Sequence, residues 1–211
     1  MVDTAYAHIR DRIITLDLAP GSPLNEEGLM RDAGVGRTPV RNALQRLAME
    51  RMVVIHPRRG SFVAEISLSD ERWLTELRLP LEGVAARLAA TRATDSEREQ
   101  MRRVCATPLD GRTPHDLLAV DATAHRLIYR STHNPHLEAT LNLHFNLGLR
   151  IWHHIHEFIP DLTKHVADEL TVLGHVAAGD AAAAQDAAEA HLVPTVSEST
   201  WIPHAAKRSP N

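Results

Sequence analysis

The sequence predicts a mainly α-helical protein of two parts, in which a single β-hairpin follows three N-terminal helices and precedes a bundle made of helices alone. Apolar residues recur at helical spacing along most of the 211 residues, and strand-like runs lie only between residues 52 and 64. Charge divides unevenly, with a balance of +2 and no lysine in residues 1–64 and a balance of −6 in residues 65–211. Such a division indicates two domains with different partners, which we place at residues 1–66 and 70–203.

The overall composition is that of a soluble globular protein, with 44% hydrophobic and 24% charged residues. The single cysteine, Cys105, excludes an internal disulfide and fits a reducing compartment. The first residues lack the basic stretch and apolar core of a signal peptide, and no run approaches the roughly 18 apolar residues of a membrane span. We therefore expect a cytoplasmic protein without a membrane partner.

The first part opens with two predicted helices. Residues 4–17 carry apolar side chains at helical spacing, and Pro20 and Gly21 stop this pattern. Asn25 then predicts the cap of a short helix with acidic residues in its first turn, where the helix dipole favours them. Gly34 predicts the end of that helix.

The next predicted helix is expected to be the one that contacts DNA. Thr38 followed by Pro39 suggests a capping hydroxyl and then proline at the first helical position, with the helix running to about Glu50. Two short helices joined by a tight glycine turn are typical of a helix-turn-helix, whose second helix enters the major groove by its N-terminus. The polar residues predicted there to contact DNA are Arg37, Thr38, Arg41, Asn42 and Gln45.

Two short apolar runs, residues 52–55 and 61–64, predict the strands of a hairpin. The turn between them carries Arg58 and Arg59, which are placed to meet phosphates or to reach a minor groove. The hairpin would be the wing of a winged helix-turn-helix.

In these positions the sequence resembles the GntR family of bacterial transcription regulators. The resemblance rests on four runs: Pro-Gly-Ser-Pro-Leu-Asn-Glu at 20–26, Gly-Val-Gly-Arg-Thr-Pro-Val-Arg at 34–41, Ala-Leu-Gln-Arg-Leu at 43–47 and Pro-Arg-Arg-Gly-Ser-Phe-Val at 57–63. It implies that Arg37, Thr38 and Arg41 contact operator DNA, which suits guanidinium chemistry.

Three residues depart from the family pattern. Gly36 stands where the family usually has Ser or Thr, Asn42 replaces the usual Glu, and Arg51 replaces a glycine after the recognition helix. These differences bear on operator sequence and affinity rather than on DNA binding itself.

The second part predicts a bundle of about six helices with no alternating strand pattern. A short linker at 67–70 precedes it. The predicted segments are 70–91, 95–106, 114–132, 136–157, 161–178 and 180–200.

Short motifs in this part fall in the order and spacing of the FCD domain, so the chain resembles the FadR subfamily of GntR regulators. They are Arg-Leu-Pro-Leu-Glu at 78–82, Asp-Ala-Thr-Ala-His at 121–125, Ser-Thr-His-Asn-Pro at 131–135, Gly-Asp at 179–180 and the late His191. The resemblance implies a divalent metal (Zn, Ni or Mn), held in the family by one Asp and three His, with a small organic acid against it. Here the implied ligands are Asp121, His125, Glu169 and His191.

The residues themselves leave several alternatives open. Asp121 and His125 share a helix face, but such a pair is more often solvated or hydrogen-bonded than metal-bound. Glu169 replaces the family's usual His, which can preserve the site, change its metal preference or abolish it. His165, one turn earlier, is the alternative fourth ligand. Arg78 is either a clamp for the effector carboxylate or the partner of a glutamate one turn on.

Four further histidines are interpreted as a partly exposed, pH-sensitive surface rather than a ligand set. They are His144, His153, His154 and His156.

Together these features predict a homodimeric repressor that binds symmetric double-stranded operator DNA with two recognition helices. A small organic acid is expected to relieve the repression. No catalytic residues are predicted. The alternatives are a metal-ion sensor, a metal-dependent enzyme built on the same ligands, and an architectural DNA-binding protein with a vestigial sensor.

Overall fold

The computed structural model describes residues 1–159 and 161–198, with side chains described as far as Leu192. The chain divides into two compact units, Met1–Ser67 and Leu68–Asn211. The last part of the predicted second domain, residues 199–203, lies outside the described residues.

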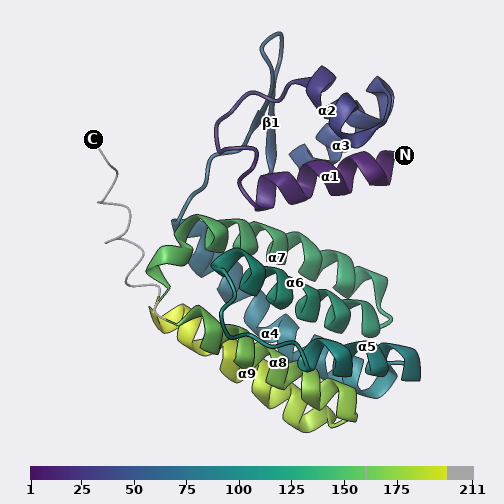
Figure 1. The fold of residues 1–211 in the computed structure, drawn as a ribbon, viewed down its shortest axis with the longest axis vertical. Helices are drawn as coiled ribbons and strands as arrows, with labels where there is room; N and C mark the ends of the chain where they lie inside the picture. The colour runs from purple at the N-terminus through teal and green to yellow at the C-terminus, as the bar shows by residue number, and fades with distance from the viewer. Residues whose placement is uncertain (160, 199–211) are drawn as a thin grey trace. The chain divides into compact units, whose positions relative to one another are not determined.

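The first unit contains three helices followed by a two-stranded hairpin, which confirms the predicted winged helix-turn-helix (Figure 1). The helices are α1 (Val2–Ile14), α2 (Glu26–Ala33) and α3 (Arg37–Met49), and the strands are β1 (Val53–His56) and β2 (Gly60–Val63). Its core forms where α1 packs on α3, with Ile9, Ile13, Val40 and Leu47 all 0% exposed. Burying each such side chain stabilises the fold by roughly 1.5–3 kcal/mol.

The ends of α2 follow the predicted capping pattern. The side-chain oxygen of Asn25 accepts hydrogen bonds from the amides of Glu27 and Gly28, at 3.0 and 3.3 Å. Gly34 ends the helix with a φ of 64°, a conformation that glycine adopts without steric cost. These two ends fix the turn that leads into α3.

The start of α3 differs from the prediction. The helix begins at Arg37 after Gly36, whose carbonyl accepts the amide of Val40, so the predicted cap at Thr38 is wrong. Thr38 and Pro39 lie instead in the first turn. Proline is tolerated there because the amide that it lacks would have no partner within the helix.

The hairpin pairs its strands antiparallel, with Val53 opposite Val63 and His56 opposite Gly60. Its turn places Arg58 at a φ of 64° and Gly60 at 97°. This tight turn leaves the arginine pair exposed at the hairpin tip.

The second unit is a bundle of helices without a strand in its described part, which confirms the predicted all-α class. Its elements are α4 (Ser69–Arg92), α5 (Asp95–Cys105), α6 (Pro114–Ser131), α7 (Pro135–Ile155), the 3₁₀ helix η1 (His156–Phe158), α8 (Leu162–Ala178) and α9 (Ala181–Glu198). Helices α6, α7, α8 and α9 all pack against α4, which lies among them in Figure 1. The described helices include none with the length and hydropathy needed to cross a bilayer.

Candidate metal centre and nucleic-acid interface

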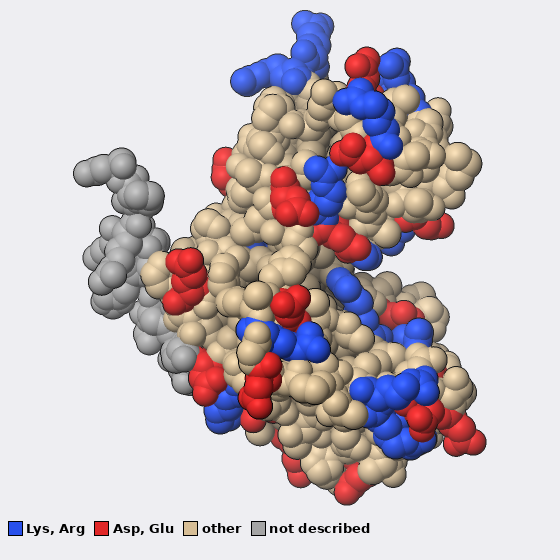
Figure 2. Space-filling model, in the orientation of Figure 1, with Lys and Arg blue, Asp and Glu red and all other residues tan. Residues whose placement is uncertain are grey.

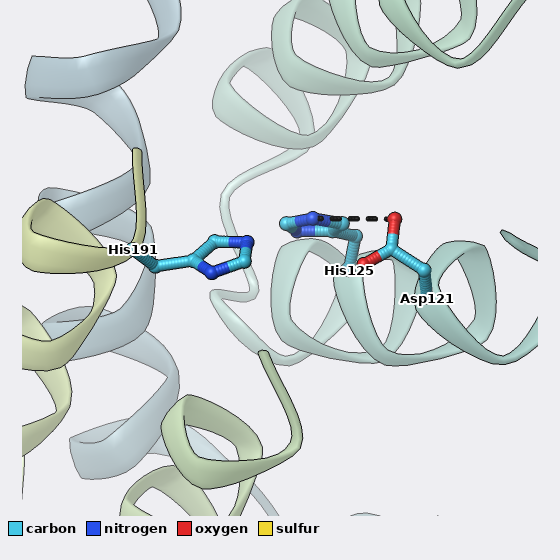
Figure 3. A group of neighbouring side chains, drawn as sticks. All are labelled: Asp121, His125 and His191. Carbon is cyan, nitrogen blue, oxygen red and sulfur yellow. Dashed lines mark ion pairs between the residues drawn. The ribbon is translucent and has the colours of Figure 1, made fainter. Parts of the chain in front are cut away.

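Three buried side chains from two helices converge in the second unit (Figure 3). Asp121 and His125 lie one turn apart on α6, and the ring of His191 points toward them from α9. One possible ligand atom from each residue lies within 4.8 Å of the other two, and Asp121 Oδ2 is 3.7 Å from His125 Nε2. The structure thus brings together three of the four predicted metal ligands.

Burial controls the protonation of these three residues. It lowers the pKa of His125 well below its usual value and that of His191 to about 4, and the charge of Arg78 acts in the same direction. Burial raises the pKa of Asp121 to about 7, against the opposing effect of Arg78. Both imidazoles are therefore neutral at pH 7, the form in which imidazole binds a metal.

Several buried polar atoms in this cluster have no hydrogen-bond partner within the described part of the chain. They are Asp121 Oδ1, His125 Nδ1, Glu169 Oε1 and both ring nitrogens of His191. Unpaired buried polar atoms are costly, and native proteins generally satisfy them with protein groups, water or ions. Imidazole nitrogen together with carboxylate oxygen is a donor set that zinc, nickel and manganese accept, so these residues fit a divalent metal.

Glu169, on α8, faces Nδ1 of His125, whereas Asp121 faces Nε2 of the same ring. Its Oε1 lies 3.1 Å from His125 Nδ1, without the alignment of a hydrogen bond, and its Oε2 lies 3.6 Å from His191 Nε2. Burial raises the pKa of Glu169 well above its usual value, and Asp121 adds to this effect. Its carboxyl group therefore contacts both histidines but is not in the three-residue group around Asp121.

His165, the alternative fourth ligand, lies on the Asp121 side of the cluster. Its Nε2 is 3.8 Å from Asp121 Oδ1. Its ring lies between those of His191 and Trp152, with centroids 4.3 and 4.2 Å away. Burial lowers the pKa of His165 well below its usual value, so it too presents a neutral imidazole.

Arg78 forms the intrahelical pair that was one of its two predicted roles. Its Nε and Nη2 donate to Glu82 Oε1 at 2.9 and 2.6 Å, and the hydroxyl of Tyr129 donates to the same oxygen at 2.5 Å. Glu82 Oε2 lies 3.9 Å from His125 Nδ1, which joins this network to the histidine cluster. Arg78 also lines a cavity beside the cluster, so contact with an effector remains a prediction.

Two cavities adjoin the cluster, of about 340 and 220 Å³ when their openings to solvent are included. Asp121 and His165 line the larger one, and Glu169 lines the smaller. His125 and His191 line both. A small molecule in the larger cavity would therefore lie beside Asp121 and all three of these histidines.

Sequence reasoning missed several side chains that line these cavities or join the network. They are Glu71, Thr75, Trp152 and Tyr129. The signal on α4 was present, because residues 71, 75, 78 and 82 are spaced three or four apart and so share one helix face. Tyr129 likewise follows His125 by four residues on α6.

The histidines near the end of α7 lie at partly or fully exposed positions. The Nδ1 atoms of His144 and His156 each lie at hydrogen-bond distance from a backbone carbonyl oxygen one turn earlier, at 2.7 and 2.9 Å. The only group of possible metal ligands among the described residues is the one on α6 and α9. This agrees with the interpretation of the α7 histidines as surface groups.

The predicted DNA-contact residues are all exposed in the first unit. Figure 2 shows basic side chains at the hairpin tip and, interspersed with acidic ones, over α2 and α3. The exposed residues are Arg37, Thr38, Arg41, Asn42 and Gln45 on α3, and Arg58 and Arg59 in the turn. Since Val40, Leu44 and Leu47 bury the other face of α3, its polar face is available to a partner.

Two family models match the chain, one over each unit. The model described as bacterial regulatory proteins, gntR family, matches residues 1–63, and the FCD domain model matches residues 73–193.

Curated relatives match part of the chain. An HTH-type transcriptional regulator of Streptomyces ambofaciens is 42% identical over 74 residues, which cover 34% of this chain and 31% of the relative. The HTH-type transcriptional repressor RspR of Escherichia coli is 36% identical over 98 residues, which cover 46% of this chain and 43% of RspR. The matches thus span less than half of either relative.

Solved structures share the fold over nearly the whole chain. Escherichia coli McbR/YncC has a TM-score of 0.73 at 17% identity and covers 96% of this chain, which in turn covers 98% of it. A GntR regulator from Rhodococcus sp. RHA1 has a TM-score of 0.69 at 19% identity, with 94% and 97% covered. At these identities the likeness extends to the fold and no further.

Proposed function

The chain belongs to the GntR family of bacterial regulatory proteins and carries the FCD domain, and from this premise we propose that it is a homodimeric repressor. In this proposal, a small organic acid that binds beside a divalent metal ion releases the repressor from operator DNA. That it is a DNA-binding transcriptional regulator follows from the family. The matched families and relatives are regulators, so the metal-dependent enzyme considered above is set aside.

The DNA contacts in this proposal come from α3 and the hairpin. Arg37, Thr38 and Arg41 stand on the exposed face of the first two turns of α3, which in a helix-turn-helix enters the major groove. Asn42 and Gln45 continue that face, and Arg58 and Arg59 extend it to phosphates or a minor groove. Two copies are required because a symmetric operator presents half-sites about one DNA turn apart.

The sensor half of the proposal depends on the buried, converging side chains of Asp121, His125 and His191, among which Asp121 Oδ1 and the ring nitrogens of His191 have no hydrogen-bond partner in the described part of the chain. Asp121, His125 and His191 would hold the metal, which would supply a Lewis acid beside the larger cavity for an effector carboxylate. In this proposal the effector acts by binding one of two domain arrangements more tightly, since a ligand with equal affinity for both shifts neither population. The name of the relative RspR supports repression as the mode of control.

The fourth ligand in the proposal is His165 rather than Glu169. His165 faces Asp121, whereas Glu169 faces the ring nitrogen of His125 remote from Asp121. A carboxylate in that second position typically orients a metal-bound imidazole. We expect His165→Ala to weaken zinc binding in isothermal titration calorimetry more than Glu169→Gln does, and the reverse order would return Glu169 to the ligand set.

The proposal is tested on the full chain by metal analysis and DNA binding. The protein as purified should contain a divalent metal, and in fluorescence anisotropy it should prefer DNA from upstream of its own gene to random DNA of equal length. One member of a panel of two- to six-carbon carboxylic acids should weaken that binding for the parent but not for His191→Ala. His144→Ala is the matched control, because this histidine lies outside the cluster.

Other results would select the alternatives. If metal alone changes operator affinity and no organic acid does, the protein is a metal-ion sensor. If neither changes affinity and no acid raises the melting temperature, the sensor is vestigial. An acid that tightens DNA binding would overturn release as the mode of control.

A further inference from the structure

The larger cavity is also lined by a buried carboxyl group, Glu71, that the metal site does not use. Glu71 lies in the first turn of α4, where an acidic side chain is normally exposed and stabilised by the helix dipole, yet it is only 3% exposed. Its Oε1 accepts a hydrogen bond from Thr75 Oγ1 at 3.0 Å. Its Oε2 has no well-aligned hydrogen-bond partner in the described part of the chain, although the side chain of Trp152 interacts with the same carboxyl group and, like Thr75, opposes the rise in its pKa that burial causes. A buried carboxylate oxygen in this state lacks a donor that a cavity occupant could supply.

The same cavity connects Glu71 to the metal ligands. Glu71 and Thr75 line it together with Asp121, His125 and His191. A ligand that binds the metal and fills this cavity would therefore also meet Glu71.

Charge indicates what that other end carries. Of the Asp, Glu, Lys and Arg side chains that line the two cavities, four are carboxyl groups and one is the guanidinium of Arg78. Arg78 is already paired with Glu82. A metal dication offsets part of the remaining negative charge, but an organic carboxylate adds to it again. A positively charged donor at Glu71 restores the balance and supplies the missing hydrogen bond.

The wall beside Glu71 also suits a cation. The indole of Trp152 lines the cavity with the His165 ring against one of its faces, so a cation–π contact with an ammonium group would use the other face. Thr75 offers a hydroxyl oxygen next to it as a further acceptor. Neither side chain adds a positive charge that would repel an amine.

We propose that the effector is a zwitterion, an amino acid whose carboxylate binds at the metal and whose protonated amine donates to Glu71 Oε2. The inference rests on the proposed function, because it takes the metal-bound carboxylate as its starting point. It assigns Glu71 as the residue that selects an amine over an uncharged chain end.

The test compares three series of ligands on the zinc-loaded full chain by calorimetry and thermal shift. They are unbranched ω-amino acids, ω-hydroxy acids and plain carboxylic acids, each of two to six carbons. One ω-amino acid should bind at least about tenfold tighter than the plain acid of equal length, the scale of a charge-assisted hydrogen bond. Glu71→Gln should reduce this preference to within about twofold.

The outcomes separate this inference from the proposed function. If the plain or hydroxy acids bind as tightly as the amino acids, Glu71 does not select an amine, although the metal-bound carboxylate stands. If no acid of any series binds, both fall. The comparison of ligands on the parent protein needs no variant, so it can contradict the inference even if Glu71→Gln fails to fold.

Discussion

Arg41 and Glu26 form an ion pair across the helix-turn-helix, in which Arg41 Nε donates to both carboxylate oxygens of Glu26, at 3.0 and 3.3 Å. The arginine is one of the residues predicted to contact operator DNA, and the glutamate stands in the first turn of α2. Their side chains are 59% and 32% exposed, so the pair contributes little to stability. Its effect is on the direction of the guanidinium.

The first prediction concerns this pair. Arg41→Ala should cost about 1–3 kcal/mol on operator DNA if the side chain reads a base. Glu26→Gln should lower the ratio of operator to random-DNA affinity, since the guanidinium loses its orientation, while it tightens binding to random DNA by removing a negative charge. In a double-mutant cycle measured by anisotropy, Glu26→Gln should not change that ratio once Arg41 is alanine. If Glu26→Gln lowers this ratio as much in the Arg41→Ala background as in the parent, the two residues act separately.

The second prediction concerns the hairpin tip. Arg58→Ala should weaken binding to all sequences alike and reduce the slope of log affinity against log salt by about 1, because a phosphate contact releases one counterion. Anisotropy titrations at several salt concentrations measure this slope. Arg102→Ala is the control, since that exposed arginine lies on α5 in the second unit. An unchanged slope for Arg58→Ala would remove the hairpin from the interface.

The third prediction concerns metal removal. Dialysis against a chelator should lower the melting temperature, and zinc should restore it, because a ligand bound only by the folded state stabilises it by about 2.7 kcal/mol at a concentration 100 times its Kd. Asp121→Asn and His191→Ala should both abolish the zinc response. His144→Ala should retain it. A parent protein whose melting temperature ignores both chelator and zinc would contradict the metal site.

The fourth prediction concerns backbone strain after the recognition helix. Arg51 has a φ of 61°, in a position where the family usually has glycine. A left-handed conformation costs a residue with a Cβ about 1–2 kcal/mol, so Arg51→Gly should stabilise the unit by up to about 1 kcal/mol after its larger unfolded-state entropy is counted. Arg51→Ala keeps the Cβ and should show no such gain in urea unfolding. Equal effects of the two changes would place the cause in the arginine side chain rather than the backbone.

The fifth prediction concerns acid stability at the start of α5. Burial alone would raise the pKa of Glu97, but hydrogen bonds from the amide and hydroxyl of Thr94 and from His133 outweigh burial and hold the pKa below its usual value. A depressed folded pKa means that the carboxylate stabilises the fold above its unfolded pKa of about 4.3 and ceases to do so as pH falls through the folded value.

Glu97→Gln should therefore lower stability by roughly 0.5–1.5 kcal/mol at neutral pH, and the difference from the parent should vanish at acid pH. Urea unfolding followed from pH 7 to pH 3 measures both. Glu99→Gln, two residues on and half-exposed, should show a smaller difference. A Glu97 difference that persists at low pH would show that shape rather than charge is responsible.

Much of the fold was predictable because its signals are local. Helical periodicity gave the segments of the bundle, and Asn25 and Gly34 marked both ends of α2. The pair Asp121 and His125 was also predictable, since four residues along one helix place two side chains on one face.

The remaining features depend on which elements pack together. No local rule shows which side of the His125 ring Glu169 faces, because that depends on how α8 lies against α6. The burial of Glu71 likewise contradicts the preference of first-turn acids for solvent, and only the packing of α7 and its Trp152 beside α4 produces it. At the start of α3, Thr38 and Pro39 predicted a cap and a first helical residue, but the helix begins two residues earlier, at Arg37.

Pro80, inside α4, divides that helix into two stretches with different attachments. Proline has no amide hydrogen, so the carbonyl four residues earlier, at Glu76, loses its intrahelical bond, and the helix bends most easily at this point. Glu71 and Thr75 precede it, on the stretch that continues from the DNA-binding unit at Ser67, while Glu82 follows it and is fastened to Tyr129. A ligand that contacts Glu71 would therefore act on the stretch of α4 that leads directly into the connection with the winged helix.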